Sequence, residues 1–273
     1  MILFDKLLKE REIILFNTKA KYISSIDNYD KKLEQIKNGL IGNNKFITEY
    51  NFIEKEFTNK FNIKECLGYS NEEFTIRNTN NNYTCNTKII HEDDVKHKIR
   101  YDHITYMLIT KAYSFEALKD YYKLIFRIRH KNGSIIKVER SVFLFRMTPD
   151  GMPFSQLDVW EVSQNNTTYV TPSYYTPNYQ TIMKDFYKLN SEILKIKFTN
   201  KEKEILSLKD KQLHNKEIAN LLNINSVRTV EKHIENMKIK VENFYMKENI
   251  KKEINSAYEV LNFAKEYGLY PYY

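Results

Sequence analysis

The chain has 273 residues, a mass of 32.9 kDa and a formal net charge of +8. Its two cysteines, Cys66 and Cys85, are too few for a disulfide framework or a four-cysteine zinc site. No stretch has the roughly 18–20 apolar residues that a membrane-spanning helix needs, and the phosphate-binding pattern Gly-x-x-x-x-Gly-Lys is missing. We therefore expect a reduced, cytoplasmic protein without a membrane segment.

Four stretches differ in pattern along the chain. Residues 1–50 are charged and carry apolar residues at helical spacing, which predicts an N-terminal helical segment ending near Gly42. Residues 51–164 mix short helices with β-rich runs. Residues 165–185 lack periodicity and are predicted to be a linker. Residues 186–273 return to helical spacing.

A β-hairpin is predicted in the second stretch. Apolar and polar residues alternate over Tyr122–Arg129, and the turn Asn132-Gly133 leads into a second extended run, Ile135–Phe145. Asn and Gly both tolerate the positive φ of a tight hairpin turn. A third strand is expected over Phe154–Val162, so this stretch reads as an α+β domain with short helices ahead of an antiparallel sheet.

Four short segments follow one another in this stretch: Leu67–Phe74, His91–Asp94, Phe126–Ser134 and Leu157–Val159. In this order they resemble the "LGYSxEE", "HPDD", "RxRxKDG" and closing "xDIT" segments of PAS sensor domains, with Glu92 in place of Pro. The resemblance covers about 100 residues. It implies a curved five-stranded sheet with helices on one side, which senses a signal or mediates dimerisation. An unidentified small ligand or protein partner is implied with it.

No metal site and no cofactor are predicted. Two zinc-binding histidines on one helix stand four residues apart, whereas His91 and His97 are six apart, so Glu92–Asp94 is interpreted as the start of a helix through Tyr101. Cys85 does not lie in the Asn-Cys-Arg-Phe-Leu-Gln motif that flavin photosensors carry. The sequence leaves open that one of four histidines is a haem ligand: His91, His97, His103 or His130.

Three helices are predicted near the C-terminus. Thr199 followed by Glu202 forms a capping box at the start of the first helix. The second helix covers Asn215–Leu222, and the third covers Val227–Val241. The third helix has an apolar stripe made of Val227, Val230, Ile234, Met237 and Val241. Its opposite side carries Arg228, Lys232, Asn236 and Lys240.

These helices resemble the LuxR/GerE helix-turn-helix family, which has the pattern "LTxREREVL…NKEIAxxL…TVxxHxxNIxxKL". The resemblance covers about 45 residues and extends into Leu261–Leu269, so it implies an all-α four-helix DNA-binding domain. The chain departs from the pattern at three places. Gln212 replaces the usual Gly, His214 replaces the usual Ser/Thr cap, and Ile224–Thr229 is one residue longer.

The position of residues within the LuxR pattern implies their contacts with DNA. Three side chains would meet base edges: Glu231, Lys232 and Glu235. Five residues would meet phosphates: Asn215, Lys216, Arg228, Thr229 and Lys240. A glutamate at position 231 would accept a hydrogen bond from cytosine N4.

Together these patterns predict a transcription regulator and not an enzyme. A PAS-like domain (51–164) would control a LuxR-type domain (186–273) that binds double-stranded DNA as a homodimer. The alternative is a protein-interaction adaptor with a degenerate helix-turn-helix. That alternative is favoured by the acidic Glu231 and Glu235, and by the near balance of 13 basic and 11 acidic residues over 198–273.

Overall fold

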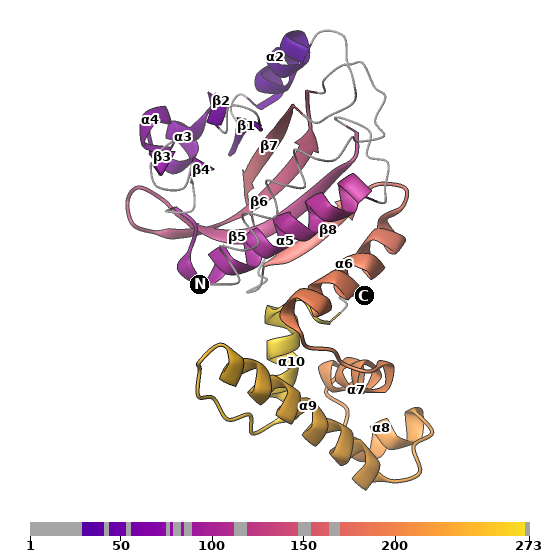
Figure 1. Cartoon of the computed structure of the whole chain (residues 1–273). Coiled ribbons are helices and arrows are strands. Elements are labelled where there is room, and N and C mark those ends of the chain that lie inside the picture. The colour runs from indigo at the N-terminus through magenta and orange to yellow at the C-terminus, as the bar shows by residue number, and fades with distance from the viewer. Residues whose placement is uncertain are drawn as a thin grey trace. The chain divides into compact units, whose positions relative to one another are not determined.

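The computed structural model describes residues 29–40, 44–52, 56–74, 77–78, 83–84, 89–111, 119–146, 154–163 and 170–270. The chain divides into two compact units, unit 1 (Met1–Phe186) and unit 2 (Tyr187–Tyr273). Unit 1 combines helices with a sheet and unit 2 is helical, which confirms the predicted α+β fold class (Figure 1). Within the described ranges, every helix is too short or too polar to cross a bilayer.

Unit 1 is built on a six-stranded antiparallel sheet with the strand order β2-β1-β7-β6-β5-β8. Its strands are β1 (Lys45–Asn51), β2 (Glu56–Phe61), β5 (Tyr121–Arg129), β6 (Ile135–Leu144), β7 (Ser155–Val162) and β8 (Thr171–Tyr175). Two short strands, β3 (Arg77–Asn78) and β4 (Tyr83–Thr84), pair separately. The predicted hairpin and third strand are confirmed as β5, β6 and β7, with Arg129 opposite Ile135 beside the turn.

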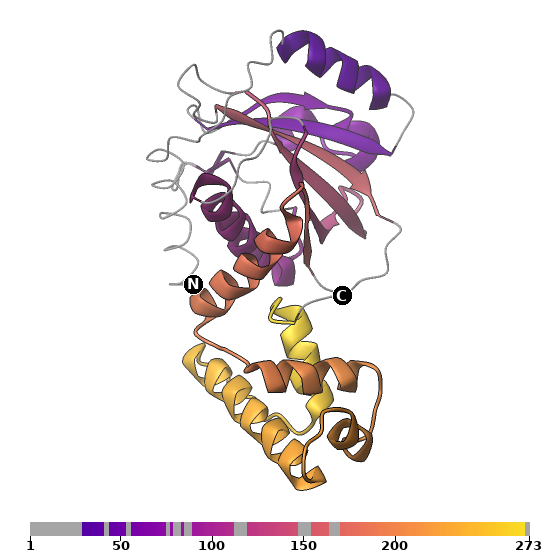
Figure 2. The same ribbon diagram turned by 90° about the vertical axis from the view of Figure 1, so that its right-hand side faces the viewer.

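Each face of the sheet is covered by a different helix (Figure 2). The helices of unit 1 are α2 (Tyr29–Leu40), α3 (Ile63–Leu67), α4 (Asn71–Phe74) and α5 (Glu92–Lys111). On the outer face, Leu33 and Leu40 of α2 pack with Ile47 and Leu157. The inner face is turned toward α5, whose Asp102 accepts a hydrogen bond from the Tyr122 hydroxyl.

Two stretches differ from the sequence prediction. Within the predicted helical segment 1–50, Tyr29–Leu40 is a helix, but Lys45–Asn51 is strand β1, and residues 1–28 lie outside the described residues. Strand β1 lacks the usual alternation because it is buried on both faces. The predicted linker 165–185 contains β8 and the start of α6 (Tyr179–Leu194). Pro172 is tolerated there because β8 is an edge strand, and the five-stranded sheet that the PAS resemblance implies therefore gains a sixth strand.

The PAS-like segment after α3 holds the turn of the β5–β6 hairpin. Gly68 has a φ of +77°, and a Cβ at this position would lie 3.1 Å from the Cβ of Lys131. The backbone N–H of Lys131 donates to the carbonyl of Leu67 at 3.0 Å. The Tyr69 hydroxyl donates to the carbonyl of Arg129 at 3.0 Å. Glycine is therefore required both by the backbone conformation and by the close approach of the hairpin.

Four helices follow α6 in unit 2, as the LuxR resemblance implies: α7 (Asn200–Asp210), α8 (Asn215–Leu221), α9 (Val227–Lys247) and α10 (Ala257–Glu266). Their apolar faces form one core, which includes Ile205, Ile218, Val230, Met237 and Phe263. Helix α9 continues past the predicted end at Val241 because Phe244 and Tyr245 are buried in the same core.

Candidate functional site: the helix-turn-helix surface and the interior of the sheet

The carboxylate of Glu202 joins α7 to α9. It accepts a hydrogen bond from the backbone N–H of Thr199 at 2.7 Å, and the Thr199 hydroxyl accepts from the backbone N–H of Glu202 at 3.2 Å, which confirms the predicted capping box. The ammonium group of Lys240 also lies 2.7 Å from this carboxylate, whose side chain is only 3% exposed. Lys240, a predicted phosphate contact, therefore also holds α9 against α7.

The N-terminal end of α8 shows how the chain accommodates its departures from the LuxR pattern. Gln212 has a φ of +62°, so the residue that replaces glycine adopts the left-handed conformation that glycine favours. His214 is the N-cap, and its backbone N–H donates to the carboxylate of Glu217 at 2.7 Å. Of the two predicted phosphate contacts on this helix, Lys216 is exposed and Asn215 is half-buried.

The turn into α9 places the additional residue ahead of the helix. Asn223 has a φ of +50°, and Ser226 caps α9 by accepting a hydrogen bond from the backbone N–H of Thr229 at 3.2 Å. The insertion therefore leaves the helical positions after Ser226 unchanged. Arg228 and Thr229, both predicted phosphate contacts, lie exposed in the first turn of α9.

Helix α9 has one buried face and one polar face along its first half. Val230, Met237 and Val241 are fully buried, Ile234 is partly buried, and Val227 is exposed although the sequence pattern places it in the apolar stripe. All three predicted base contacts are exposed: Glu231, Lys232 and Glu235. Glu235 pairs with Lys238 at 3.0 Å. The first three turns of α9 thus present an exposed mixed-charge face opposite the buried one.

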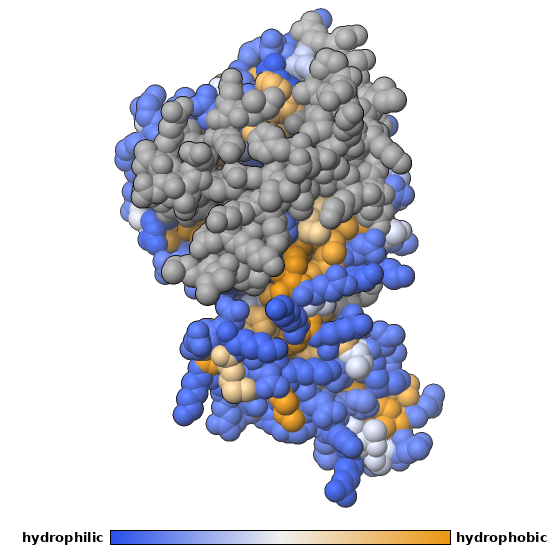
Figure 3. All heavy atoms as spheres, in the orientation of Figure 1, coloured by the Kyte–Doolittle hydropathy of each residue, from blue (hydrophilic) through white to orange (hydrophobic). Residues whose placement is uncertain are grey.

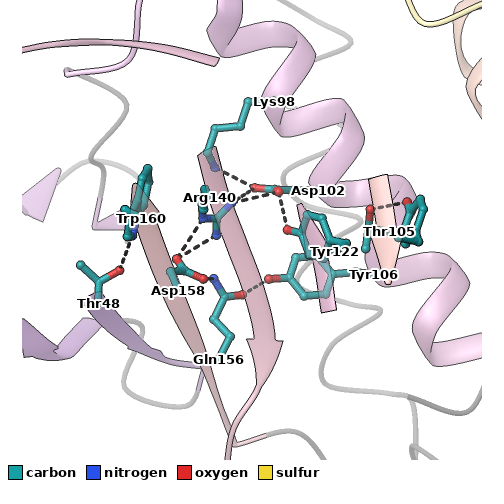
Figure 4. A network of polar contacts seen from close by, with 11 residues as sticks. Thr48, Lys98, Asp102, Thr105, Tyr106, Tyr122, Arg140, Gln156, Asp158 and Trp160 are labelled. Carbon is teal, nitrogen blue, oxygen red and sulfur yellow. Dashed lines mark hydrogen bonds and ion pairs between the residues drawn. The ribbon is translucent and has the colours of Figure 1, made fainter. Parts of the chain in front are cut away.

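A network of charged side chains is buried between α5 and the inner face of the sheet (Figure 4). The Arg140 guanidinium on β6 lies 3.1 Å from Asp102 on α5 and 2.9 Å from Asp158 on β7. The ammonium group of Lys98 lies 2.7 Å from Asp102. The Tyr122 hydroxyl donates to Asp102 at 2.5 Å. Two cations and two carboxylates balance each other, as buried charges require.

Neutral polar groups extend this network across the interior of the sheet. The Gln156 amide donates to Asp158 at 2.8 Å and accepts a hydrogen bond from the Tyr106 hydroxyl. The hydroxyls of Thr105 and Tyr174 lie 2.7 Å apart. Polar groups from α5 and from strands β5, β6, β7 and β8 therefore converge on one buried region of unit 1.

The protonation states of the network follow from its partners. Burial raises the pKa of Asp158, and the charge of Arg140 opposes this rise. Burial, assisted by the charge of Asp102, raises the pKa of Tyr122 well above its usual value, so this phenol remains a donor. Burial lowers the pKa of Arg140, but the two carboxylates more than offset it, so the guanidinium stays charged.

Two of the four candidate haem ligands, His97 and His130, make local contacts within the chain. The His97 ring nitrogen Nδ1 lies 3.0 Å from the Arg100 guanidinium. His130 Nδ1 accepts a hydrogen bond from the backbone N–H of Asn132 at 3.1 Å. Among the residues that the structure describes, no three side chains of His, Cys, Asp or Glu are grouped as a metal site would require. Cys85 lies outside the described residues.

Unit 2 has the fold and the surface of a helix-turn-helix domain. Residues 197–244 match the sequence profile described as "Bacterial regulatory proteins, luxR family". The chain therefore carries a LuxR-type helix-turn-helix domain, as its sequence pattern implies. No curated protein matches the chain.

The solved structures to which the chain is similar include two VqmA structures and a PAS domain. The phage VqmA–DPO complex is 14% identical, with 90% of this chain and 94% of that chain covered and a TM-score of 0.30. The Vibrio cholerae VqmA dimer is 12% identical over 87% and 88%, with a TM-score of 0.31. The PAS domain of an HTR-like protein from Haloarcula marismortui is 11% identical over 49% and 93%, with a TM-score of 0.30.

Proposed function

We propose that this protein is a cytoplasmic transcription regulator that binds double-stranded DNA as a homodimer. The observation that carries the proposal is the exposed polar half of α9, opposite a fully buried face, within residues that match the luxR family. Glu231, Lys232 and Glu235 would read base edges in the major groove. The pseudo-twofold symmetry of the DNA site would match that of the dimer.

The phosphate contacts would position α9 in the groove. Lys216 and Arg228 are exposed cations on two different helices, and Asn215 and Thr229 add polar groups in the first turns of α8 and α9. Lys240 would reach a phosphate only in competition with Glu202, which already holds its ammonium group. Lys216 and Arg228 therefore supply the main electrostatic contribution in this proposal.

Unit 1 would sense a signal, or mediate dimerisation, and so control the helix-turn-helix. Its buried charged network supports a sensing role, because a small ligand or a protein partner that shifted α5 would separate Asp102 from Arg140. Breaking such a buried contact costs several kcal/mol. Two arrangements of α5, one with this contact and one without it, would therefore differ clearly in free energy. The proposal includes no catalytic step.

The salt dependence of DNA binding tests this function against the adaptor alternative. A dimer that neutralises about six phosphates is expected to lose affinity with a log–log slope of roughly −5 against salt concentration. Fluorescence anisotropy with labelled DNA over a range of salt concentrations measures this slope. The variant Lys216→Ala removes one phosphate contact from each protomer, so it should reduce the magnitude of the dimer's slope by about two. Specific binding without a salt slope would contradict the phosphate contacts, and no binding at any salt concentration would favour the adaptor.

A further inference from the structure

One aliphatic side chain lies on the exposed face of α9, directly after the polar positions of that face. Ile239 is 46% exposed, whereas Val230, Met237 and Val241 on the opposite side of the helix are fully buried in the core of unit 2. The surface of unit 2 is mostly hydrophilic, with small orange patches (Figure 3). A single exposed aliphatic residue is ordinary on a protein surface. The position of Ile239 on the helix is what makes it informative.

Ile239 continues the row of side chains that the proposed function assigns to base reading. It follows Lys232 by seven residues and Glu235 by four, so the three side chains lie on one side of α9. All three are exposed. Ile239 lies about 10 Å beyond Lys232 along the helix axis, which corresponds to about three base-pair steps of roughly 3.4 Å. A helix that places Lys232 and Glu235 in a major groove would therefore place Ile239 over the same half-site.

Two lysines flank Ile239, one on each side of this row. Lys238 and Lys240 are its neighbours in sequence, and successive side chains of a helix point about 100° apart, so the two lysines lie on opposite sides of the isoleucine. They are held in place by Glu235 and Glu202, at 3.0 Å and 2.7 Å. A major groove has base edges on its floor and a phosphate backbone along each rim. The central position between two cations therefore corresponds to the floor of the groove.

We propose that Ile239 contacts the 5-methyl group of a thymine and so helps to select the DNA sequence. This inference rests on the proposed function. The methyl group of thymine is the only methyl group that the four bases present in the major groove. An aliphatic side chain would cover the donors and acceptors of the other bases without replacing their hydrogen bonds to water. Each half-site is therefore expected to contain a thymine about three base pairs from the base that Lys232 contacts.

Replacing thymine by deoxyuridine tests this contact, because deoxyuridine pairs as thymine does and lacks only the methyl group. The full-length protein is titrated by fluorescence anisotropy against a DNA site recovered by selection, in which the thymines of one half-site are replaced one at a time. The affinity of the wild type is expected to fall roughly fourfold at one position, the contribution of about one buried methyl group. That position should lie about three base pairs from the base at which Lys232→Ala blurs the selected motif.

The variant Ile239→Ala removes the contact and keeps a residue that favours the helix. It should bind the thymine site as weakly as the wild type binds the deoxyuridine site, and removing the same methyl group should then cost it nothing further. Because Ile239 lies outside the core, the variant should unfold at the urea concentration of the wild type. Met246→Ala is the matched control, since it shortens another exposed apolar side chain of α9, which is 61% exposed. This control should keep the wild-type dependence on the methyl group.

The possible outcomes separate the thymine contact from the proposed function. Sequence-specific binding by the wild type with no thymine at which deoxyuridine lowers the affinity would overturn the contact. An Ile239→Ala protein that keeps the wild-type dependence on the methyl group would overturn it as well, because another residue would then read that base. Failure of the wild type to bind any DNA would overturn the proposed function instead.

Discussion

Replacing Arg140 by leucine is expected to destabilise unit 1 by about 3–5 kcal/mol, the cost of breaking a buried ion pair from one side. The Arg140 side chain is 4% exposed and contacts the carboxylates of both Asp102 and Asp158. Leucine fills part of the space but leaves two buried carboxylates with only the single cation of Lys98 nearby. One of the two carboxylates must then take up a proton, or water must enter the interior to solvate it.

Urea unfolding followed by tryptophan fluorescence measures this effect. The chain has one tryptophan, Trp160 on β7, which is fully buried beside Arg140, so its emission reports on unit 1. Lys123→Leu is the matched control on the neighbouring strand. Its ammonium group pairs with Glu139 at 2.8 Å on the partly exposed outer face, and losing that pair should cost about 0–1 kcal/mol. An Arg140→Leu protein as stable as this control would contradict the role given to the network.

Replacing Glu202 by alanine is expected to destabilise unit 2 by about 2–4 kcal/mol, since a helix cap and hydrogen bonds to a charged group are removed together. The carboxylate serves the backbone N–H of Thr199 and the ammonium group of Lys240 at the same time. Because Lys240 is 33% exposed, its ammonium group can regain water, which keeps the cost below that of a fully buried pair.

Far-UV circular dichroism follows the loss of helix in unit 2, while the fluorescence of Trp160 should remain unchanged. Glu204→Ala is the matched control because Glu204 lies in the same helix and forms an exposed pair with Lys201. Its loss should cost less than about 1 kcal/mol. If both alanine variants unfold at the same urea concentration, the carboxylate of Glu202 does not hold α7 and α9 together.

The helix-turn-helix could be predicted from the sequence because its signals are local. The capping box of Thr199 and Glu202 lies within four residues, and the buried stripe of α9 repeats every three or four residues. The end of α9 could not be placed in the same way. Phe244 and Tyr245 extend the helix through contacts with the distant Phe263, and this tertiary packing has no local signal.

Unit 1 was harder to predict because its structure depends on contacts between distant segments. Strand β1 is covered on both faces, so it lacks the alternation of a half-buried strand. Strand β8 is short and contains a proline, which is not typical of a strand in sequence. The charged network looks like ordinary surface charge on α5. Arg140 did carry a signal, since it is in phase with the buried Val138 and Val142 on an alternating strand. A charged residue at such a position needs a buried partner.

Selection of binding sites from a pool of genomic DNA fragments tests the proposed role of α9 most directly. The purified wild-type protein is expected to recover a twofold-related motif, and Lys232→Ala should blur it at the base that Lys232 contacts. Lys251→Ala removes an exposed lysine from the turn after α9 and should recover the wild-type motif. Recovery of an equally sharp motif by Lys232→Ala would contradict the base-reading role of Lys232. Recovery of no motif by the wild type would contradict sequence-specific DNA binding itself under those conditions.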